Sequence, residues 1–366
     1  MKHYILVAGV DYEFHGVDFR VLADNRRKLL TQANSAKADL RFTTFDFRAG
    51  TVVVTNVTYP GGVKTESASQ TTPFKPIGPA NYDEVTSASG AKHKVFKNGQ
   101  TGIASILDVY AKVREIGAAD PGTLAELSFL SHGWMGGPIL VNSYDDRQAI
   151  LPLPSTGSAP TEMLMTITGT NRDPDDHDPR GQFDFVAPTM DAPSLATFRK
   201  AFASDAIIWL WGCAFPRVVH HLLWAMERAP TYKSTGLADD DQLVMDAVTK
   251  DDVDYLETFL APLIGRFPSR STITVKFKYL KYAVCAMNAQ GYAWQICEAA
   301  QVPTRSAALG TYADYDQSGP NPLMSVDAGF SAHFAFYKNY LGFSFDPDGR
   351  HYAIYTPGRA CTAPTP

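Results

Sequence analysis

Two short motifs place reactive side chains directly after hydrophobic runs. His132-Gly133 follows the run Leu124–Leu130 with only Ser131 between them, and Gly212-Cys213 directly follows the run Ala206–Trp211. A cysteine attacks as a thiolate, so it needs a base or a positive neighbour, and histidine is the usual base because its ordinary pKa is near neutrality. The sequence therefore predicts Cys213 as a nucleophile and His132 as its base.

The same motifs supply candidate donors for an oxyanion hole. Acyl transfer needs backbone N–H groups aimed at the oxygen that becomes negative in the transition state. Gly133 has no side chain, so its N–H can approach a ligand closely. The N–H of Cys213 stands where a strand leads into a helix, which makes it a second natural donor. We therefore expect Gly133 and Cys213 to form the oxyanion hole.

The hydrophobic pattern predicts an α/β protein. Continuous apolar runs indicate strands that are buried on both faces, and apolar residues at helical spacing indicate helices. The first 229 residues predict strands at His3–Val10, Leu40–Phe47, Thr51–Val57, Leu124–Leu130 and Ala206–Trp211, the second and third forming a hairpin, and helices at Phe19–Ala33, Thr101–Ile116, Pro193–Ala203 and Phe215–Arg228. This alternation implies a mostly parallel sheet with helices on both faces. Ligands of such sheets bind beyond the carboxyl ends of the strands, where both motifs lie.

The remaining segments predict a loop, an insertion and a β-rich end. Residues 59–99 are rich in Pro, Gly, Ser and Thr and predict a long loop, while residues 142–193 are polar and Pro-rich and predict an insertion at the active-site edge. Later segments predict partial helix at Asp239–Leu260, a half-exposed strand at Ser271–Tyr279, a helix at Ala289–Ala300, a strand at Pro303–Leu309 and β-structure at Phe330–Tyr355. We interpret residues 1–366 as one domain, in which the C-terminal portion 230–366 carries no recognisable motif.

The order of these elements resembles the caspase-like cysteine peptidases, which include caspases, metacaspases, gingipains, clostripain and legumain. The motifs that carry the resemblance are Leu-Ser-Phe-Leu-Ser-His132-Gly133, Ile-Ile-Trp-Leu-Trp-Gly212-Cys213 and the opening strand and turn Ile-Leu-Val-Ala-Gly9-Val10-Asp11-Tyr12. The resemblance covers about residues 3–229. It implies a three-layer caspase-like fold and a cysteine endopeptidase with a Cys213–His132 dyad, acting on a peptide or protein substrate.

The loop after the first strand bears on substrate choice. In caspase-like folds this loop helps to form the pocket for the residue before the scissile bond. Here it holds Asp11, Glu13, His15 and Asp18, with Arg20 just beyond. Carboxylates at Asp11, Glu13 and Asp18 would favour a Lys or Arg side chain by charge pairing; the alternative is that these side chains cap the following helix or face solvent.

Two further clusters contain residue types that bind metals. Asp173, Asp175 and Asp176, with Asp178, are oxygen ligands of the kind that calcium prefers, although Asp178 stands where an EF-hand loop needs Gly. We therefore expect no cofactor, with calcium as the alternative. His220-His221 lie one turn into a predicted helix, and no other ligand is spaced to join them, so a solvated or capping role is expected.

Two alternative functions remain open from the sequence. An α/β-hydrolase of the esterase or lipase type could use His132-Gly133 as an oxyanion loop, with His333 or His351 as its acid–base partner, but no nucleophile elbow is present. A catalytically inactive caspase-like binding protein is the other. Its support is that Gly212 replaces the Ala or Ser usual before the nucleophile, that Ala214-Phe215 follow it, and that 81 residues separate His132 from Cys213.

Composition excludes several broad classes. The formal net charge is −5, from 33 Lys and Arg against 38 Asp and Glu, which disfavours a nucleic-acid binder. The longest apolar runs fall far short of the roughly 18–20 residues that span a bilayer, and the N-terminus lacks a signal-peptide pattern, so a cytoplasmic location is expected. The four cysteines include no C-x-x-C pair, which predicts a reducing compartment, or at least no dependence on disulfides.

Overall fold

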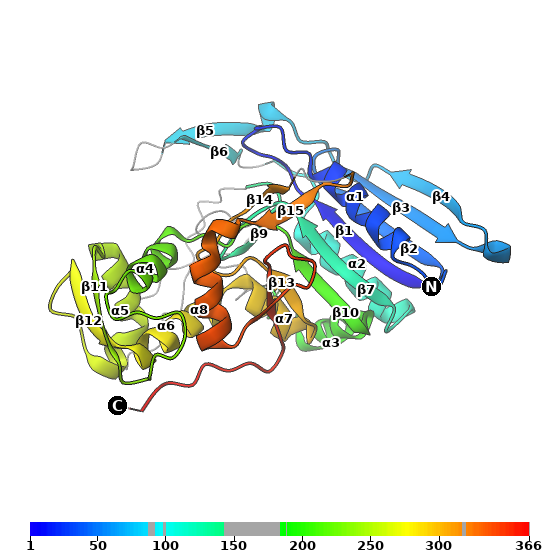
Figure 1. Ribbon diagram of the computed structural model, residues 1–366. Helices are drawn as coiled ribbons and strands as arrows, with labels where there is room; N and C mark the ends of the chain where they lie inside the picture. Colours follow the sequence, from blue (N-terminus) through cyan, green and yellow to red (C-terminus); the bar gives the residue numbers. More distant parts are fainter. Residues whose placement is uncertain (87–91, 98–99, 143–183, 188, 317–319, 366) are drawn as a thin grey trace.

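The fold is organised around a nine-stranded central sheet, shown in Figure 1. The computed structural model describes residues 1–366 except 87–91, 98–99, 143–183, 188, 317–319 and 366. In spatial order, the strands are β16 (Ser344–Phe345), β17 (Ala353–Tyr355), β13 (Thr304–Ser306), β10 (Phe202–Leu210), β7 (Leu124–Leu130), β1 (Lys2–Ala8), β2 (Leu40–Asp46), β3 (Thr51–Thr58) and β4 (Thr65–Thr71). The five strands from β13 to β2 are parallel, and the strands at both edges are antiparallel.

Helices cover both faces of this sheet. Helix α1 packs on β1, β2 and β7 from one face, whereas α2, α3 and α7 cover the other (Figure 1). The helices span α1 Phe19–Gln32, α2 Ile106–Ala119, α3 Ala192–Ala201, α4 Arg217–Glu227, α5 Lys250–Ile264, α6 Phe277–Gln290, α7 Tyr292–Ala300 and α8 Ser331–Leu341. The expected α/β class, with a mostly parallel sheet between two layers of helices, is confirmed.

A buried ion pair fixes α1 against the strand that leads to His132. The Nε and Nη2 atoms of Arg26 donate to the two carboxylate oxygens of Glu126 on β7, at 2.8 and 2.6 Å. Glu126 is 2% exposed, so an unpaired charge at this position would be strongly destabilising. The guanidinium also lies over the stacked rings of Trp209 and Trp211 at the end of β10. This contact therefore joins α1 to both strands that carry the motifs.

Short antiparallel pairs flank the sheet. They are β5 (Tyr82–Thr86) with β6 (Lys92–Phe96), β8 (His132–Trp134) with β9 (Gly137–Ile139), β11 (Gln242–Asp246) with β12 (Thr272–Lys276), and β14 (Ala313–Asp316) with β15 (Leu323–Val326). The pair β11–β12 lies with α4, α5 and α6 beside the β13 side of the sheet, at the left of Figure 1.

Three segments differ from the sequence-based expectation. The predicted loop 59–99 contains β4, β5 and β6; every residue of β4 is exposed, so no apolar alternation marked it as a strand. The predicted strand Ser271–Tyr279 stops at Lys276, because Phe277 begins α6 and its apolar residues continue at helical spacing. The predicted β-rich end holds helix α8, whose aromatic residues favour strands but here line a helix.

The predicted insertion 142–193 is described only at its ends. Asn142 follows β9, and the ring of Phe185 is buried against Tyr110 and Phe198. Residues 143–183, which include the calcium candidates Asp173, Asp175 and Asp176, lie outside the described residues.

The cysteines include a disulfide, which was not expected from the sequence. Cys285 on α6 and Cys361 form a disulfide across 76 residues of sequence. No local spacing signals such a pair, because the fold alone brings the two residues together. Cys213 and Cys297 are the free cysteines.

Among the described residues, no helix is both long and apolar enough to cross a membrane.

Candidate active site

The ends of β7 and β10 bring the two motifs into backbone contact. The strands are parallel neighbours, with Leu127 beside Ile208 and Phe129 beside Leu210. A methyl group added at Gly212 would lie 2.8 Å from Gly133 N, 2.8 Å from Ser131 O and 2.9 Å from the carbonyl carbon of His132. These atoms are backbone and cannot swing away. Glycine at position 212 is therefore what lets the two motifs approach so closely.

An aspartate holds the His132 ring from the β1 side. His132 Nε2 lies 3.1 Å from Asp11 Oδ1, and the rings of Tyr12 and Phe19 pack against the imidazole. An ionised carboxylate only accepts hydrogen bonds, so the proton of a neutral imidazole belongs on Nε2 here. Nδ1 then keeps its lone pair and is the nitrogen that can accept a proton.

Asp11 is itself fixed by the loop that carries it. Its Oδ2 accepts hydrogen bonds from the N–H groups of Gly16 and Val17, at 2.8 and 3.1 Å. Burial would raise the pKa of Asp11, but the bonds from His132, Gly16 and Val17 outweigh it and hold the pKa below its ordinary value. Asp11 is therefore a carboxylate at neutral pH, which is the state that orients a histidine.

The side chain of Cys213 points to a different neighbour. Its thiol lies 3.4 Å from the carbonyl oxygen of Ala313 and donates to it. Burial raises the pKa of the Cys213 thiol; the Ala313 contact offsets part of this rise, and the Asp314 carboxylate adds to it. In this conformation Cys213 is a neutral thiol.

A short backbone bridge holds the acceptor of that thiol in place. Ala214 N donates to Thr311 O at 3.1 Å, and Gly310 N donates to Ala214 O at 2.7 Å. The segment 310–313 thus runs antiparallel to the residues that follow Cys213. The cavity beside Cys213 has a volume of about 20 Å³, room for about one water molecule, and Gly133, Asn288, Tyr292, Leu309 and Tyr355 are among its lining residues.

The carboxylates expected to bind substrate already have partners in the protein. Asp11 bonds to His132, and Asp18 caps α1 by accepting from the N–H groups of Arg20 and Val21. Both nevertheless line a groove of about 470 Å³, together with Arg20, Asp46 and Arg48. Glu13 lies half-buried in the same loop.

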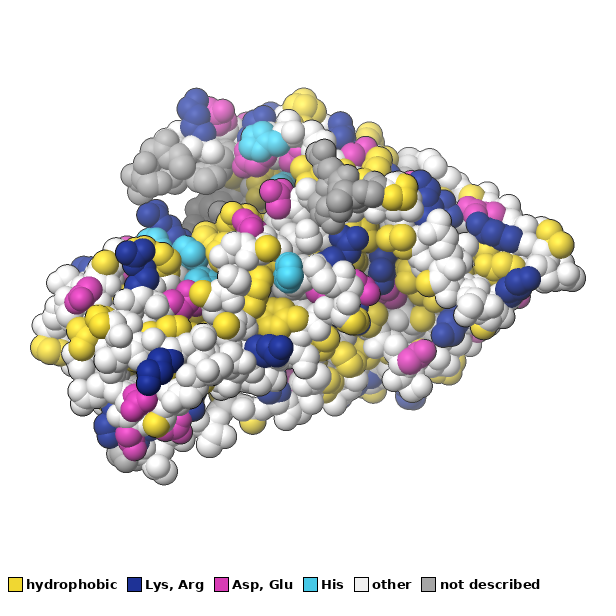
Figure 2. Space-filling model, viewed as in Figure 1, with side chains coloured by type: hydrophobic (Ala, Val, Ile, Leu, Met, Phe, Trp, Pro, Cys, Tyr) yellow, Lys and Arg dark blue, Asp and Glu magenta, His cyan; other side chains and the backbone are white. Residues whose placement is uncertain are grey.

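A second chain of titratable groups lies beneath segment 310–313 and was not expected from the sequence. His220 Nδ1 is 3.0 Å from His333 Nε2, and His333 Nδ1 is 2.7 Å from Glu227 Oε1. Figure 2 shows histidines grouped near α4. His220 thus bonds to another side chain although it is partly exposed, whereas His221 lies 3.7 Å from Asp252. The described residues hold no group of three or more His, Cys, Asp or Glu side chains arranged for a metal.

These contacts bear on the α/β-hydrolase alternative. Its candidate acid–base partner His333 is engaged with His220 and Glu227, and its other candidate, His351, stacks on Phe334. His132, by contrast, is oriented by a carboxylate at the sheet edge. Asp11 in this positioning role was missed because the sequence showed only that it follows the first strand. That strand, β1, is the direct neighbour of β7.

Comparison with known proteins gives one weak likeness. No protein-family model matches the chain, and no curated protein matches it. Among solved structures, the chain is similar to a secreted C11 cysteine protease from Bacteroides thetaiotaomicron, determined in complex with an irreversible peptide inhibitor. The identity is 11%, the similarity covers 94% of this chain and 71% of that chain, and the TM-score is 0.25. A TM-score this low says nothing about catalytic residues or substrate.

Proposed function

We propose that the protein is a caspase-like cysteine endopeptidase in which Cys213 is the nucleophile and His132 the base. The observation that carries the proposal is the backbone contact of His132-Gly133 with Gly212-Cys213 at the ends of β7 and β10, beside an imidazole oriented by Asp11. The element order through β10 also supports it, because it follows the strand and helix order that the resemblance implies.

The proposal implies the following chemical steps. Cys213 leaves the carbonyl of Ala313 and gives its proton to Nδ1 of His132, and the thiolate attacks the substrate carbonyl. The N–H groups of Gly133 and Cys213 stabilise the oxyanion. His132 then protonates the leaving amine, and water, deprotonated by His132, hydrolyses the thioester. Asp11 stabilises the imidazolium that forms during transfer.

A Cys213→Ala variant tests the assignment. Loss of the nucleophile is expected to lower kcat by several orders of magnitude, on the order of 10⁴-fold or more, without changing the fold. The measurement is hydrolysis of a fluorogenic peptide library, with far-UV circular dichroism as the check on folding. Cys297→Ser is the matched control, because Cys297 is the other free cysteine and is not among the residues that line the cavity beside Cys213. Full turnover by Cys213→Ala would overturn the proposal.

Preference for Lys or Arg before the scissile bond is part of the same proposal. The groove beside His132 holds the carboxylates of Asp11, Asp18 and Asp46 against two guanidiniums, and one of these, Arg20, already bonds to Asp24. Excess negative charge attracts a basic side chain. Matched peptides with Lys, Leu or Asp at that position are expected to be cleaved in that order, and faster cleavage of the Asp peptide would contradict the preference.

An inactive binding protein is the second candidate, and a specific observation favours it. The Cys213 thiol is neutral, bonded to Ala313 and next to a cavity with room for about one water molecule. An inactive relative would show Cys213 reacting with iodoacetamide no faster than the buried Cys297, and no hydrolysis of any peptide.

A fluorophosphonate probe that labels the wild type would point instead to a serine hydrolase.

A further inference from the structure

The C-terminal strap, defined as residues 356–365, is tied to α6, α7 and α8, of which α6 and α7 contribute residues to the lining of the Cys213 cavity. Gly358 N donates to Glu298 on α7, and Lys278 on α6 donates to Thr365 O. Arg359 lies over the ring of Phe343 and donates to the carbonyl of Leu341 at the end of α8. The disulfide Cys285–Cys361 is the covalent link among these contacts.

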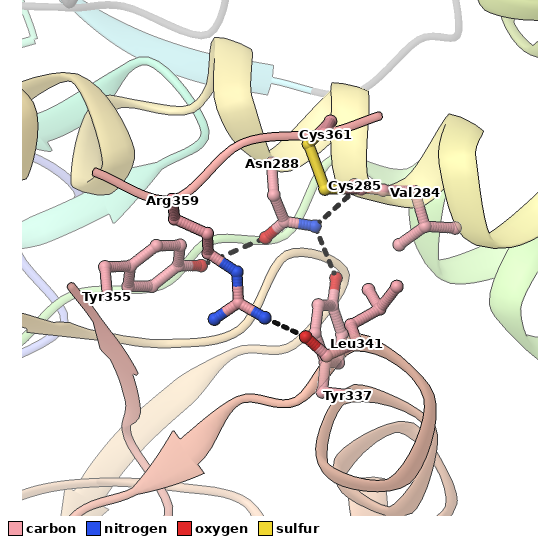
Figure 3. Close-up of a disulfide and its surroundings, with 8 residues drawn as sticks. All are labelled: Val284, Cys285, Asn288, Tyr337, Leu341, Tyr355, Arg359 and Cys361. Carbon is pink, nitrogen blue, oxygen red and sulfur yellow. Dashed lines mark hydrogen bonds between the residues drawn. A yellow bond between two sulfur atoms is a disulfide. The ribbon is translucent and has the colours of Figure 1, made fainter. Parts of the chain in front are cut away.

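One turn of α6 connects this disulfide to the cavity. Figure 3 shows Asn288 one turn beyond Cys285, with its amide between the hydroxyls of Tyr337 and Tyr355. Asn288 is 1% exposed; its Nδ2 also donates to Val284 O at 2.7 Å, and its Oδ1 accepts from Tyr355 at 3.1 Å. Such a fully bonded, buried amide transmits a shift of its helix to its partners.

The partners of Asn288 themselves form the wall of the cavity. Asn288, Tyr355 and Leu309 line it together with Cys213, and Tyr337 donates to the carbonyl of Leu309 at 2.8 Å. Leu309 directly precedes the segment 310–313 that carries Ala313, the acceptor of the Cys213 thiol. A continuous set of bonded residues therefore runs from the disulfide to the contact that holds Cys213 in its resting position.

We propose that the Cys285–Cys361 disulfide is a redox-sensitive restraint that keeps Cys213 in its resting contact through Asn288 and Leu309. Both cysteines are half-buried, so a small dithiol can reach the bond. The dithiol donates two electrons and two protons: the S–S bond breaks, two thiols form at Cys285 and Cys361, and the dithiol becomes a cyclic disulfide. The strap is then held only by noncovalent contacts, α6 loosens, and Cys213 opens toward solvent.

The alkylation rate of Cys213 tests this restraint without relying on catalysis. The effect of the restraint on turnover rests on the proposed function, whereas the reaction of Cys213 with iodoacetamide can be measured whether or not the protein is a peptidase. In the Cys285→Ser/Cys361→Ser variant, which needs no reductant during the assay, this rate is expected to rise roughly tenfold, within the range that local opening produces. Mass spectrometry of the Cys213 peptide gives the rate.

Lys278→Ala is the matched control. It removes the contact between the strap and α6 at Thr365 while the disulfide and the Asn288 bonds remain, so the rate is expected to stay at the wild-type value. If the double variant does not fold, wild-type protein reduced on an immobilised phosphine and then separated from it takes its place. An unchanged alkylation rate would overturn the proposal. Global unfolding on reduction would also overturn it, because the bond would then act on overall stability rather than on Cys213.

Discussion

The two halves of the candidate site differ in how they hold their reactive side chain. On the β1 side, His132 bonds to a buried carboxylate whose pKa is lowered, and two backbone N–H groups fix that carboxylate. On the α4 side, the one bond of Cys213 to a described residue is to a carbonyl oxygen, burial raises the pKa of its thiol, and the adjoining cavity is very small. The His132 ring is oriented by its carboxylate, whereas the Cys213 thiol keeps its proton.

This difference indicates where control of the site would lie. Under the proposed function, a base that is already oriented needs no rearrangement before reaction, while a thiol bonded to Ala313 must turn before it can attack. Substitutions on the β1 side should therefore change the chemical step itself. Substitutions on the α4 side should change how readily Cys213 leaves its resting position, or the stability of the contact between the two motifs.

The largest effect is expected from Asp11→Asn. The change removes the charge that orients His132 and stabilises its protonated form, and we expect kcat to fall by roughly 10²–10⁴-fold. Hydrolysis of the Leu peptide across pH 5–9 is the measurement. Asp18→Asn is the control for kcat, because it removes one carboxylate from the same groove without touching His132, and asparagine is an equally good helix cap. Equal activity of the two variants would remove Asp11 from the positioning of His132.

A smaller effect, on stability, is expected from Gly212→Ala. The added methyl group would lie 2.8 Å from two backbone atoms of the His132 motif, so the strand ends must separate. Overpacking of this kind costs roughly 1–3 kcal/mol in the free energy of unfolding, which urea denaturation measures. Gly78→Ala is the control, since a methyl group there would contact nothing within 4 Å. Identical urea midpoints for both variants would show that the two motifs lie farther apart.

The smallest effect is a pH dependence on the α4 side. Burial, then His333 and His221, lower the pKa of His220 below its ordinary value of 6.5. The unfolded chain therefore binds a proton at His220 more readily than the folded chain does. The contribution of neutral His220 to the free energy of unfolding is complete above about pH 6.5 and is lost as the pH falls through the lowered pKa. Melting temperatures between pH 7.5 and 5 should fall less steeply for His220→Gln than for the wild type. Burial also lowers the pKa of His3, so His3→Gln is the comparison variant. If the melting temperature depends on pH equally in His220→Gln and in the wild type, His220 does not contribute to this pH dependence.

The sequence predicted strands and helices best where burial is two-sided or strictly periodic. Strand β7 matches its predicted bounds, and α1 differs by one residue, because long apolar runs and helical spacing leave few alternatives. Strand β4 could not be predicted from an exposed polar run, and α8 was misassigned because its aromatic residues favour strands. Local pattern thus fixed the centre of the sheet but not its periphery.

The candidate site was predictable in position but not in side-chain direction. Two motifs at the ends of neighbouring parallel strands must approach each other, which required only the topology. That Asp11 binds His132 depends on β1 lying next to β7, and that Cys213 faces Ala313 depends on a backbone carbonyl about 100 residues later. Every residue has a backbone carbonyl, so the sequence does not indicate which carbonyl accepts the bond from Cys213. The disulfide likewise joins residues 76 apart that only the packed strap brings together.

The strand order of the central sheet also sets a sequence of events during synthesis. Strands β1 and β7, with Asp11 and His132, are complete once 132 residues exist, whereas the Cys213 cavity requires β13 and β17, whose last residue is Tyr355. At a synthesis rate of about 5–20 residues per second, the roughly 200 intervening residues take about 10–40 s. A growing chain can therefore pair β1 with β7, which carry Asp11 and His132 at their ends, before Cys213 is synthesised. The residues that line the Cys213 cavity are synthesised later still. During that interval Cys213 lacks the wall of Leu309 and Tyr355, so its thiol is less shielded than in the complete fold.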